Sequence, residues 1–258
     1  MLSLLDATKP YIDNFYGIRI STRPDYIDRE VLSILKSYKV TTIELGAQSM
    51  DDKVLTLNNR GHLSSDVVNA SKLIKEFAFN LGLQMMTGLY GSNSDSDIAT
   101  AKKFIELKPD CVRIYPTVIV KNTELESLYK QGKYTPSTLE QSIDLCADLL
   151  CLFNDNNIDV IRLGLHYSDS LVDSMVYNNY HPAFKELCES IIMLNKTIKR
   201  LNDISRKNII VYINKKSLSK FFGQHKSNIN RLNALGYNVK VDFDDTLGKY
   251  EIIVKEQR

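Results

Sequence analysis

From residue 17 onward, short runs of β-branched residues alternate with longer amphipathic stretches, and this alternation limits the fold more than any other feature. The short runs predict strands, whereas the stretches between them repeat apolar residues every three to four positions and predict helices. Repeated strand–helix units are typical of a parallel sheet with crossover helices. The expected strands are Gly17–Ser21, Thr41–Leu45, Leu83–Thr87, Cys111–Tyr115 and Asp159–Leu163.

The first four expected strands each end in small or polar residues. The carboxyl ends of parallel strands share one edge, and ligands bind at that edge in open α/β sheets and in barrels. Glycine at a strand end lets the backbone approach a ligand, and Gln, Ser and Thr supply hydrogen bonds. We therefore expect a ligand site there, with ordinary turns as the alternative. The segments concerned are 21–25, 46–49, 87–91 and 115–117.

Composition narrows the class of protein. With 43% apolar and 25% charged residues, the chain is globular rather than disordered, collagen-like or coiled coil. No stretch approaches the roughly 18 apolar residues of a membrane span, so we expect a cytoplasmic protein with no membrane association. Irregularly spaced cysteines in a chain of this size favour reduced thiols. They are Cys111, Cys146, Cys151 and Cys188.

Charge divides the chain into two expected domains. Residues 1–195 form the α/β part, and residues 196–258 carry 14 Lys and Arg against 6 Asp and Glu. A basic patch is typical of a phosphate-binding surface, although basic solvated faces are also common. The tail is expected to be a small β-α-β-β domain. Its predicted elements are Ile209–Ile213, Ser217–Leu235, Asn238–Phe243 and Tyr250–Val254.

Within this basic tail, Gly223 and Lys226 lie at a predicted helix start, where backbone N–H groups favour a phosphate. The segment resembles the KH-type nucleic-acid module, whose G-x-x-G loop clamps backbone phosphates. Lys226 stands where that loop has its second glycine. The expected RNA-binding residues are Lys216, Lys220, Gly223 and Lys226, and a helix junction without a ligand is the alternative.

Five segments, in this order, resemble motifs of the radical S-adenosylmethionine (SAM) superfamily: Gly17–Ile27, Ile43–Asp52, Asn59–His62, Gln84–Gly91 and Val112–Thr117. The nearest branch contains the oxygen-independent coproporphyrinogen oxidases and the Elongator catalytic subunit. The resemblance implies a partial, TIM-like (β/α) barrel of parallel strands. It also implies SAM and a [4Fe–4S] cluster that together yield a 5′-deoxyadenosyl radical, in an enzyme of oxidoreductase or tRNA-modifying type.

The sequence departs from this family in its cluster motif. The family holds its cluster with C-x3-C-x2-C and binds the SAM amino group with Gly-Gly-Ser/Glu, and neither motif is present. Cys146 and Cys151 lie about 140° apart around a predicted helix and do not converge on one iron. The histidines lack metal-ligand spacing, so no metal site is expected. We expect that an N-terminal cluster-binding portion is missing and that the chain alone does not cleave SAM.

The resemblance assigns SAM contacts at five positions. Gln48 matches a glutamine that reaches the ribose hydroxyls, and Arg60 matches an arginine that pairs with the methionine carboxylate. Gln84 and Ser21 stand where the coproporphyrinogen branch has acids for the ribose. The turn Gly88–Gly91 corresponds to the segment that lies against adenine. No catalytic residue is assigned.

Alternatives remain open for some of these positions. Arg60 and His62 are also consistent with a solvated helix start, and Glu44, inside a strand, with an ion pair to a neighbouring arginine. A non-catalytic RNA-binding module, with tRNA as its first candidate partner, is the alternative function. A first strand without a neighbour and an uncovered apolar sheet face would promote association. We therefore expect a homodimer, or a partner that supplies the missing N-terminal half.

Overall fold

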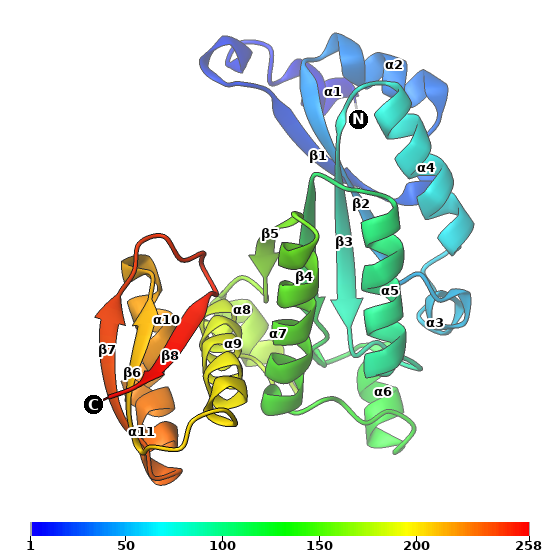
Figure 1. The fold of residues 1–258 in the computed structure, drawn as a ribbon. Coiled ribbons are helices and arrows are strands. Elements are labelled where there is room, and N and C mark those ends of the chain that lie inside the picture. Colours follow the sequence, from blue (N-terminus) through cyan, green and yellow to red (C-terminus); the bar gives the residue numbers. More distant parts are fainter. Residues whose placement is uncertain (1, 258) are drawn as a thin grey trace. The chain divides into compact units, whose positions relative to one another are not determined.

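The computed structural model describes residues 2–257 (Figure 1). The chain forms two compact units. The first comprises the chain up to Thr138 together with Leu152–Asn179, and the second comprises Leu139–Cys151 together with the chain from Tyr180 onward. Helix α7 (Leu139–Asp155) runs from the second unit into the first.

The first unit is built on a five-stranded sheet whose strands follow chain order and are all parallel. All five expected strands are confirmed, with bounds that differ by up to three residues. The sheet explains why the sequence alternates between apolar strands and amphipathic helices, because each crossover helix must return the chain to the same edge. The strands are β1 (Ile18–Thr22), β2 (Val40–Gln48), β3 (Asn80–Thr87), β4 (Cys111–Pro116) and β5 (Asp159–Leu163).

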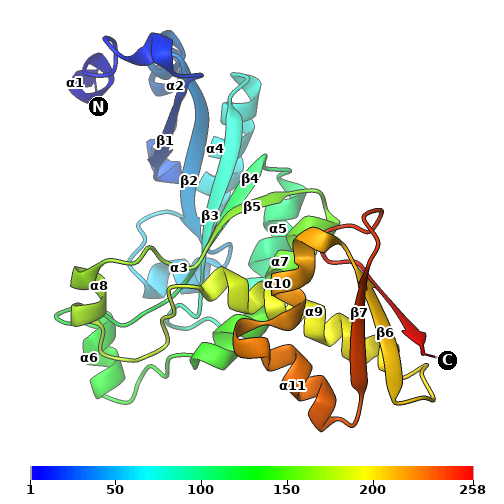
Figure 2. The ribbon, with the colours of Figure 1, turned by 90° about the vertical axis from the view of Figure 1, so that its left-hand side faces the viewer.

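Crossover helices pack on one face of this sheet. Helix α2 contacts β2, α4 contacts β2 and β3, and α5 contacts β3 (Figure 2). Their starts are fixed by capping side chains: Asp28 accepts from the Val31 N–H, and Asn93 accepts from the Ser96 N–H. The helices are α1 (Leu2–Asp6), α2 (Arg29–Ser37), α3 (Asp52–Leu57), α4 (Ser64–Glu76), α5 (Ser94–Glu106), α6 (Glu124–Lys130) and α8 (Asp169–Ser174), with 3₁₀ turns η1 (Ile12–Asn14) and η2 (Pro24–Tyr26).

The opposite face of the sheet is polar. Strand residues alternate between the two faces, so the buried Ile43 and Leu45 face one way and Glu44 the other. The expectation of an uncovered apolar face is therefore wrong, because charged and amide side chains occupy the alternate positions. β1 does lie at the edge of the sheet, as expected. Self-association of the chain remains a prediction.

The second unit contains a three-stranded sheet in the order β7-β6-β8, with β7 parallel and β8 antiparallel to β6. The expected strands are confirmed, but the single helix predicted over Ser217–Leu235 is wrong. The chain turns at Gly223, which has φ +70°, and divides that segment into two helices. The elements are β6 (Asn208–Ile213), β7 (Asn238–Phe243), β8 (Ile252–Glu256), α9 (Phe184–Leu201), α10 (Leu218–Phe222), α11 (Ser227–Ala234), η3 (Lys215–Ser217) and η4 (Gln224–Lys226).

A buried asparagine links three helices of this unit. Asn228 in α11 donates to the carbonyl oxygens of Ser190 in α9, at 2.9 Å, and of Phe221 in α10, at 3.0 Å. The bond to Phe221 satisfies a carbonyl group in the last turn of α10, and the bond to Ser190 ties that turn to the middle of α9. In neither unit does a helix within residues 2–257 combine the length and apolar character of a membrane span.

Candidate functional site

The carboxyl ends of the five parallel strands lie along one edge, as the sequence predicts. Bonds between neighbouring strand ends fix this edge: Thr117 N–H donates to Thr87 O at 2.9 Å, and Gly164 N–H donates to Ile114 O at 3.0 Å. Loops that follow the strands therefore start from a rigid frame. Such a frame is needed to hold several side chains around one ligand.

At the end of β2, a histidine and an arginine from the loop after α3 lie against the strand. His62 is 5% exposed, and its Nε2 lies 3.1 Å from the Ala47 carbonyl oxygen, next to Gln48. The backbone of Gln48 has φ +64°, and its side chain is buried beside Gly46. The interpretation of a solvated helix start is therefore wrong for His62, whose imidazole is part of the strand-end packing.

Arg60 is half-buried and electrostatically uncompensated. Its Nε is buried without a hydrogen-bond partner in the part of the chain that the structure describes. Burial, reinforced by the nearby charge of Arg23, lowers the pKa of Arg60. Arg60 and His62 line a surface cavity of about 550 Å³ together with Thr56, Asn59, Gly61, Leu63 and Asp66, whose carboxylate accepts from the Leu63 N–H at 2.8 Å. This guanidinium is suited to a carboxylate or phosphate ligand, which would supply both an acceptor and a countercharge.

The turn after β3 is held from two sides. The Gly88 N–H donates to the Asp97 carboxylate of α5 at 2.9 Å, and the Tyr134 hydroxyl donates to the Gly88 carbonyl at 2.6 Å. Further along, Asn58 donates to the Tyr90 carbonyl at 2.8 Å. Burial raises the pKa of Asp97 to about 6. Sequence reasoning missed Asp97 and Tyr134, because neither adjoins the strand end in the chain.

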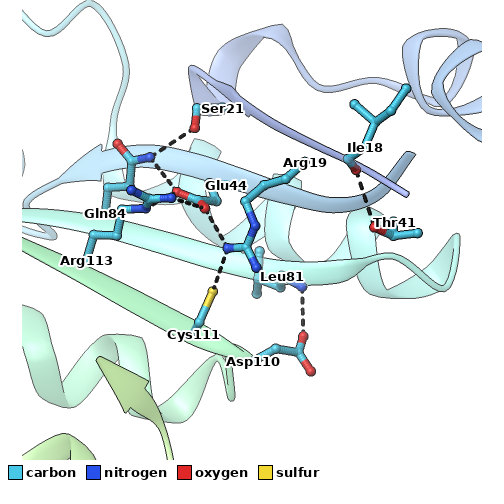
Figure 3. Close-up of polar contacts among 10 residues, drawn as sticks. All are labelled: Ile18, Arg19, Ser21, Thr41, Glu44, Leu81, Gln84, Asp110, Cys111 and Arg113. Atoms are coloured by element: carbon cyan, nitrogen blue, oxygen red, sulfur yellow. Dashed lines mark hydrogen bonds and ion pairs between the residues drawn. The ribbon is translucent and has the colours of Figure 1, made fainter. Parts of the chain in front are cut away.

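On the polar face of the sheet, three side chains from three strands converge on Glu44 of β2 (Figure 3). Arg19 Nη1 lies 2.6 Å from Glu44 Oε1, Arg113 Nε lies 2.6 Å from Oε2, and Gln84 donates to Oε2 at 2.8 Å. Gln84 also donates to Ser21 Oγ at 3.1 Å, so two of the predicted ribose-binding residues are brought together. The ion-pair interpretation of Glu44 is confirmed.

Glu44 is 1% exposed and remains ionised. Burial alone would raise the pKa of its carboxyl, but the hydrogen bonds from Arg113, Arg19 and Gln84 outweigh burial and lower the pKa below its usual value. Both carboxylate oxygens are already engaged, so Glu44 positions the two guanidiniums rather than accepting a proton. Cys111 adjoins this cluster and accepts from Arg19 at 3.4 Å.

The expected RNA-binding residues all lie in the second unit. Lys216 and Lys226 are exposed, whereas Lys220 is partly covered and lies 3.8 Å from the Glu189 carboxylate. Gly223 and Lys226 stand between α10 and α11, as expected for a loop that joins two helices. Of the three lysines, Lys226 is exposed on the loop between α10 and α11, Lys216 is exposed in η3 before α10, and Lys220 lies close to an acid.

The cysteines do not fit an iron–sulfur cluster. Cys111 lies on β4, Cys146 and Cys151 on α7, and Cys188 on α9. Among residues 2–257, no three His, Cys, Asp or Glu side chains are grouped so that they could hold a metal ion. The chain's own residues thus fit the carboxylate end of SAM at Arg60, but not the cluster to which SAM binds in the family that the motifs resemble.

A five-stranded parallel sheet with crossover helices on one face and all carboxyl strand ends along one edge is an α/β fold of the partial-barrel class. Residues 2–105 match the model of the Radical SAM superfamily, and residues 109–193 match that of the Radical_SAM C-terminal domain. The chain therefore belongs to the radical SAM superfamily.

Characterised relatives match about half of the chain. The tRNA uridine(34) acetyltransferase of Dehalococcoides mccartyi is 35% identical over 139 residues, which cover 53% of this chain and 30% of that protein. Human Elongator complex protein 3 is 34% identical over 139 residues, which cover 25% of its length. The archaeal Elp3 of Methanocaldococcus infernus, solved without its residues 1–46, has the same fold with a TM-score of 0.60 and 23% identity, over 74% of this chain and 43% of that one. The chain thus spans less than a third of the first two relatives.

Proposed function

We propose that the strand-end edge of the first unit binds SAM, with Arg60 pairing with the methionine carboxylate and Gln48 bonding to the ribose. The proposal is carried by Arg60, a residue that lines the cavity beside His62 and whose buried Nε lacks a hydrogen-bond partner within residues 2–257. Leaving a guanidinium desolvated and unpaired is costly, and a bound carboxylate removes that cost.

The remaining positions support the same ligand. Gln84 directs its amide nitrogen to Ser21 and Glu44, which leaves its carbonyl oxygen pointing away from the cluster and able to accept from a hydroxyl (Figure 3). The turn Gly88–Gly91 is held by Asp97 and Tyr134, so its backbone presents a fixed surface for a base. Pre-organised groups of this kind bind with a smaller entropic cost.

Calorimetry with two ligands tests this assignment. Arg60→Gln should weaken SAM binding about tenfold or more, because a charge-assisted bond to carboxylate is lost. The same change should leave methylthioadenosine, which lacks the amino-acid group, almost unaffected. Arg29→Gln, an exposed arginine on α2, is the matched control. Equal weakening of both ligands would mean that Arg60 only supports the fold, and the proposal would fail.

We further propose tRNA as the substrate class, since the relative from Dehalococcoides mccartyi is named for uridine 34 of tRNA. Because the cysteines do not converge, we expect the chain alone neither to hold a cluster nor to cleave SAM. Anaerobic reconstitution with iron and sulfide, followed by chromatography for 5′-deoxyadenosine, should give no product. A stoichiometric cluster absorbance from the wild-type chain would contradict this expectation.

RNA binding by the second unit is a second candidate function. It is favoured by exposed Lys226 on the loop that joins two helices at Gly223 and by exposed Lys216 in η3, just before the first of these helices. Fluorescence anisotropy with labelled tRNA should show affinity that falls steeply with salt, and Lys216→Gln or Lys226→Gln should reduce the salt slope by about one. Lys72→Gln, exposed on α4, is the control. An affinity that does not depend on salt would exclude this function.

A further inference from the structure

Two arginines lie side by side on the polar face of the sheet. Arg113 of β4 and Arg162 of β5 are direct partners in the parallel register, so their side chains leave the same face from neighbouring strands. Like charges in such positions repel each other and destabilise a sheet. Glu44 compensates Arg113, but no acidic side chain within residues 2–257 forms an ion pair with Arg162, whose Nε donates only to the Gly164 carbonyl at 3.2 Å.

The whole face carries an excess of positive charge. Arg19, Arg113 and Arg162 face the same side, and the buried Glu44 is the acid that pairs with the first two. The carboxylate binds the inner N–H groups of Arg19 and Arg113, while their side chains remain 43% and 25% exposed. Arg113 places both Nε and Nη2 on Glu44, at 2.6 and 2.9 Å, so only the guanidinium N–H groups outside this bidentate pair are available to a further acceptor. Fold stability alone would not favour Arg162, which has no acidic partner within residues 2–257, beside Arg113, which is paired with Glu44.

We propose that Arg113 and Arg162 bind the phosphate group of a nucleotide, which would be the anionic part of the RNA substrate. This inference rests on the proposed function and names a subsite of it. A phosphate fits better than a carboxylate because its non-bridging oxygens point in different directions, so that the Arg162 guanidinium and the N–H groups of Arg113 that Glu44 does not bind each find an acceptor. Glu44 is then a positioning residue, since it fixes the direction of the Arg113 fork.

The first test uses the wild-type chain and follows the guanidinium N–H resonances of its arginines, including the Nη groups, by NMR. Uridine 5′-monophosphate should shift the Arg113 and Arg162 signals, and uridine at the same concentration should not. Inorganic phosphate should shift the same signals more weakly, and acetate should have little effect. Shifts of equal size with uridine would overturn the phosphate assignment, and equal shifts with inorganic phosphate would overturn the nucleotide assignment.

The second test uses variants of the residue without an ion-pair partner. Arg162→Gln should weaken uridine monophosphate binding about tenfold, Arg162→Lys should give an intermediate loss because the charge remains without the fork, and Arg29→Gln should have no effect. SAM binding should be unchanged in all three. If Arg162→Gln leaves the nucleotide affinity intact, this inference fails while the SAM proposal stands. The SAM proposal is tested separately by Arg60→Gln, which is the variant expected to lose SAM affinity.

Discussion

Asp97 makes the stability of the first unit depend on pH. Its carboxyl is 3% exposed and accepts from the Gly88 N–H, and burial raises its pKa from 3.8 to about 6. Since the folded state holds the proton more tightly than the unfolded state, the stability contributed by this group is complete below pH 4 and is lost as pH rises through 6. The shift corresponds to about 3 kcal/mol.

The perturbation is Asp97→Asn, which keeps an acceptor for Gly88 but cannot ionise. Urea unfolding between pH 4 and 7.5 should show the wild type losing about 3 kcal/mol relative to the variant over that range. Comparing the two chains cancels the titration of other groups, such as Glu44. Asp95→Asn, an exposed position in the same helix, should follow the wild type at every pH. If the wild type and Asp97→Asn run parallel from pH 4 to 7.5, the reasoning is refuted.

Two further changes test packing by urea unfolding. Gly91→Ala should lower the free energy of unfolding by about 2–4 kcal/mol, because φ is +82° and the added Cβ would lie 2.5 Å from Leu57 Cδ1. Its control is Gly132→Ala, which should lower that free energy by only about 1–2 kcal/mol, because φ is +69° there and nothing lies within 4 Å of the added Cβ. Tyr250→Phe should cost about 1–2 kcal/mol, because it removes the 2.8 Å bond from the buried hydroxyl to Glu189, and an unchanged midpoint would contradict the role of this bond.

Local sequence patterns predicted the sheet and its ligand edge, because both depend on signals within a few residues. The run from Cys111 to Tyr115 reads as a buried strand from its own side chains, and a parallel sheet then places all carboxyl ends together. The break at Gly223 was missed for the opposite reason. Its flanking residues continue a helical pattern, and the positive φ of His225 and Lys226 depends on how the two helices pack.

Side-chain partners from distant segments were harder to predict. Glu44 was expected to pair with an arginine, but nothing near it in the sequence identifies Arg19 and Arg113, which lie 25 and 69 residues away. Asp97 was missed because its partner, the Gly88 N–H, is a backbone group on another element. A useful signal was present nonetheless: a charged residue in the middle of an apolar strand must have a partner on the same face.

Four arginines of the first unit, Arg19, Arg113, Arg60 and Arg162, differ in their partners, and this difference bears on function. Arg19 and Arg113 are fixed by Glu44, so their charge is compensated within the protein. Arg60 has a buried Nε without a partner within residues 2–257, and Arg162 has only a backbone carbonyl. Neither of these two arginines forms an ion pair with an acid within residues 2–257, and each lies close to the carboxyl end of a strand or of the loop that follows it. An arginine without an acidic partner, held beside ordered groups, favours an anionic ligand. Because the cysteines do not fit a cluster, we expect ligand binding to be separable from radical chemistry in this chain, and ligand affinity is the property to measure first.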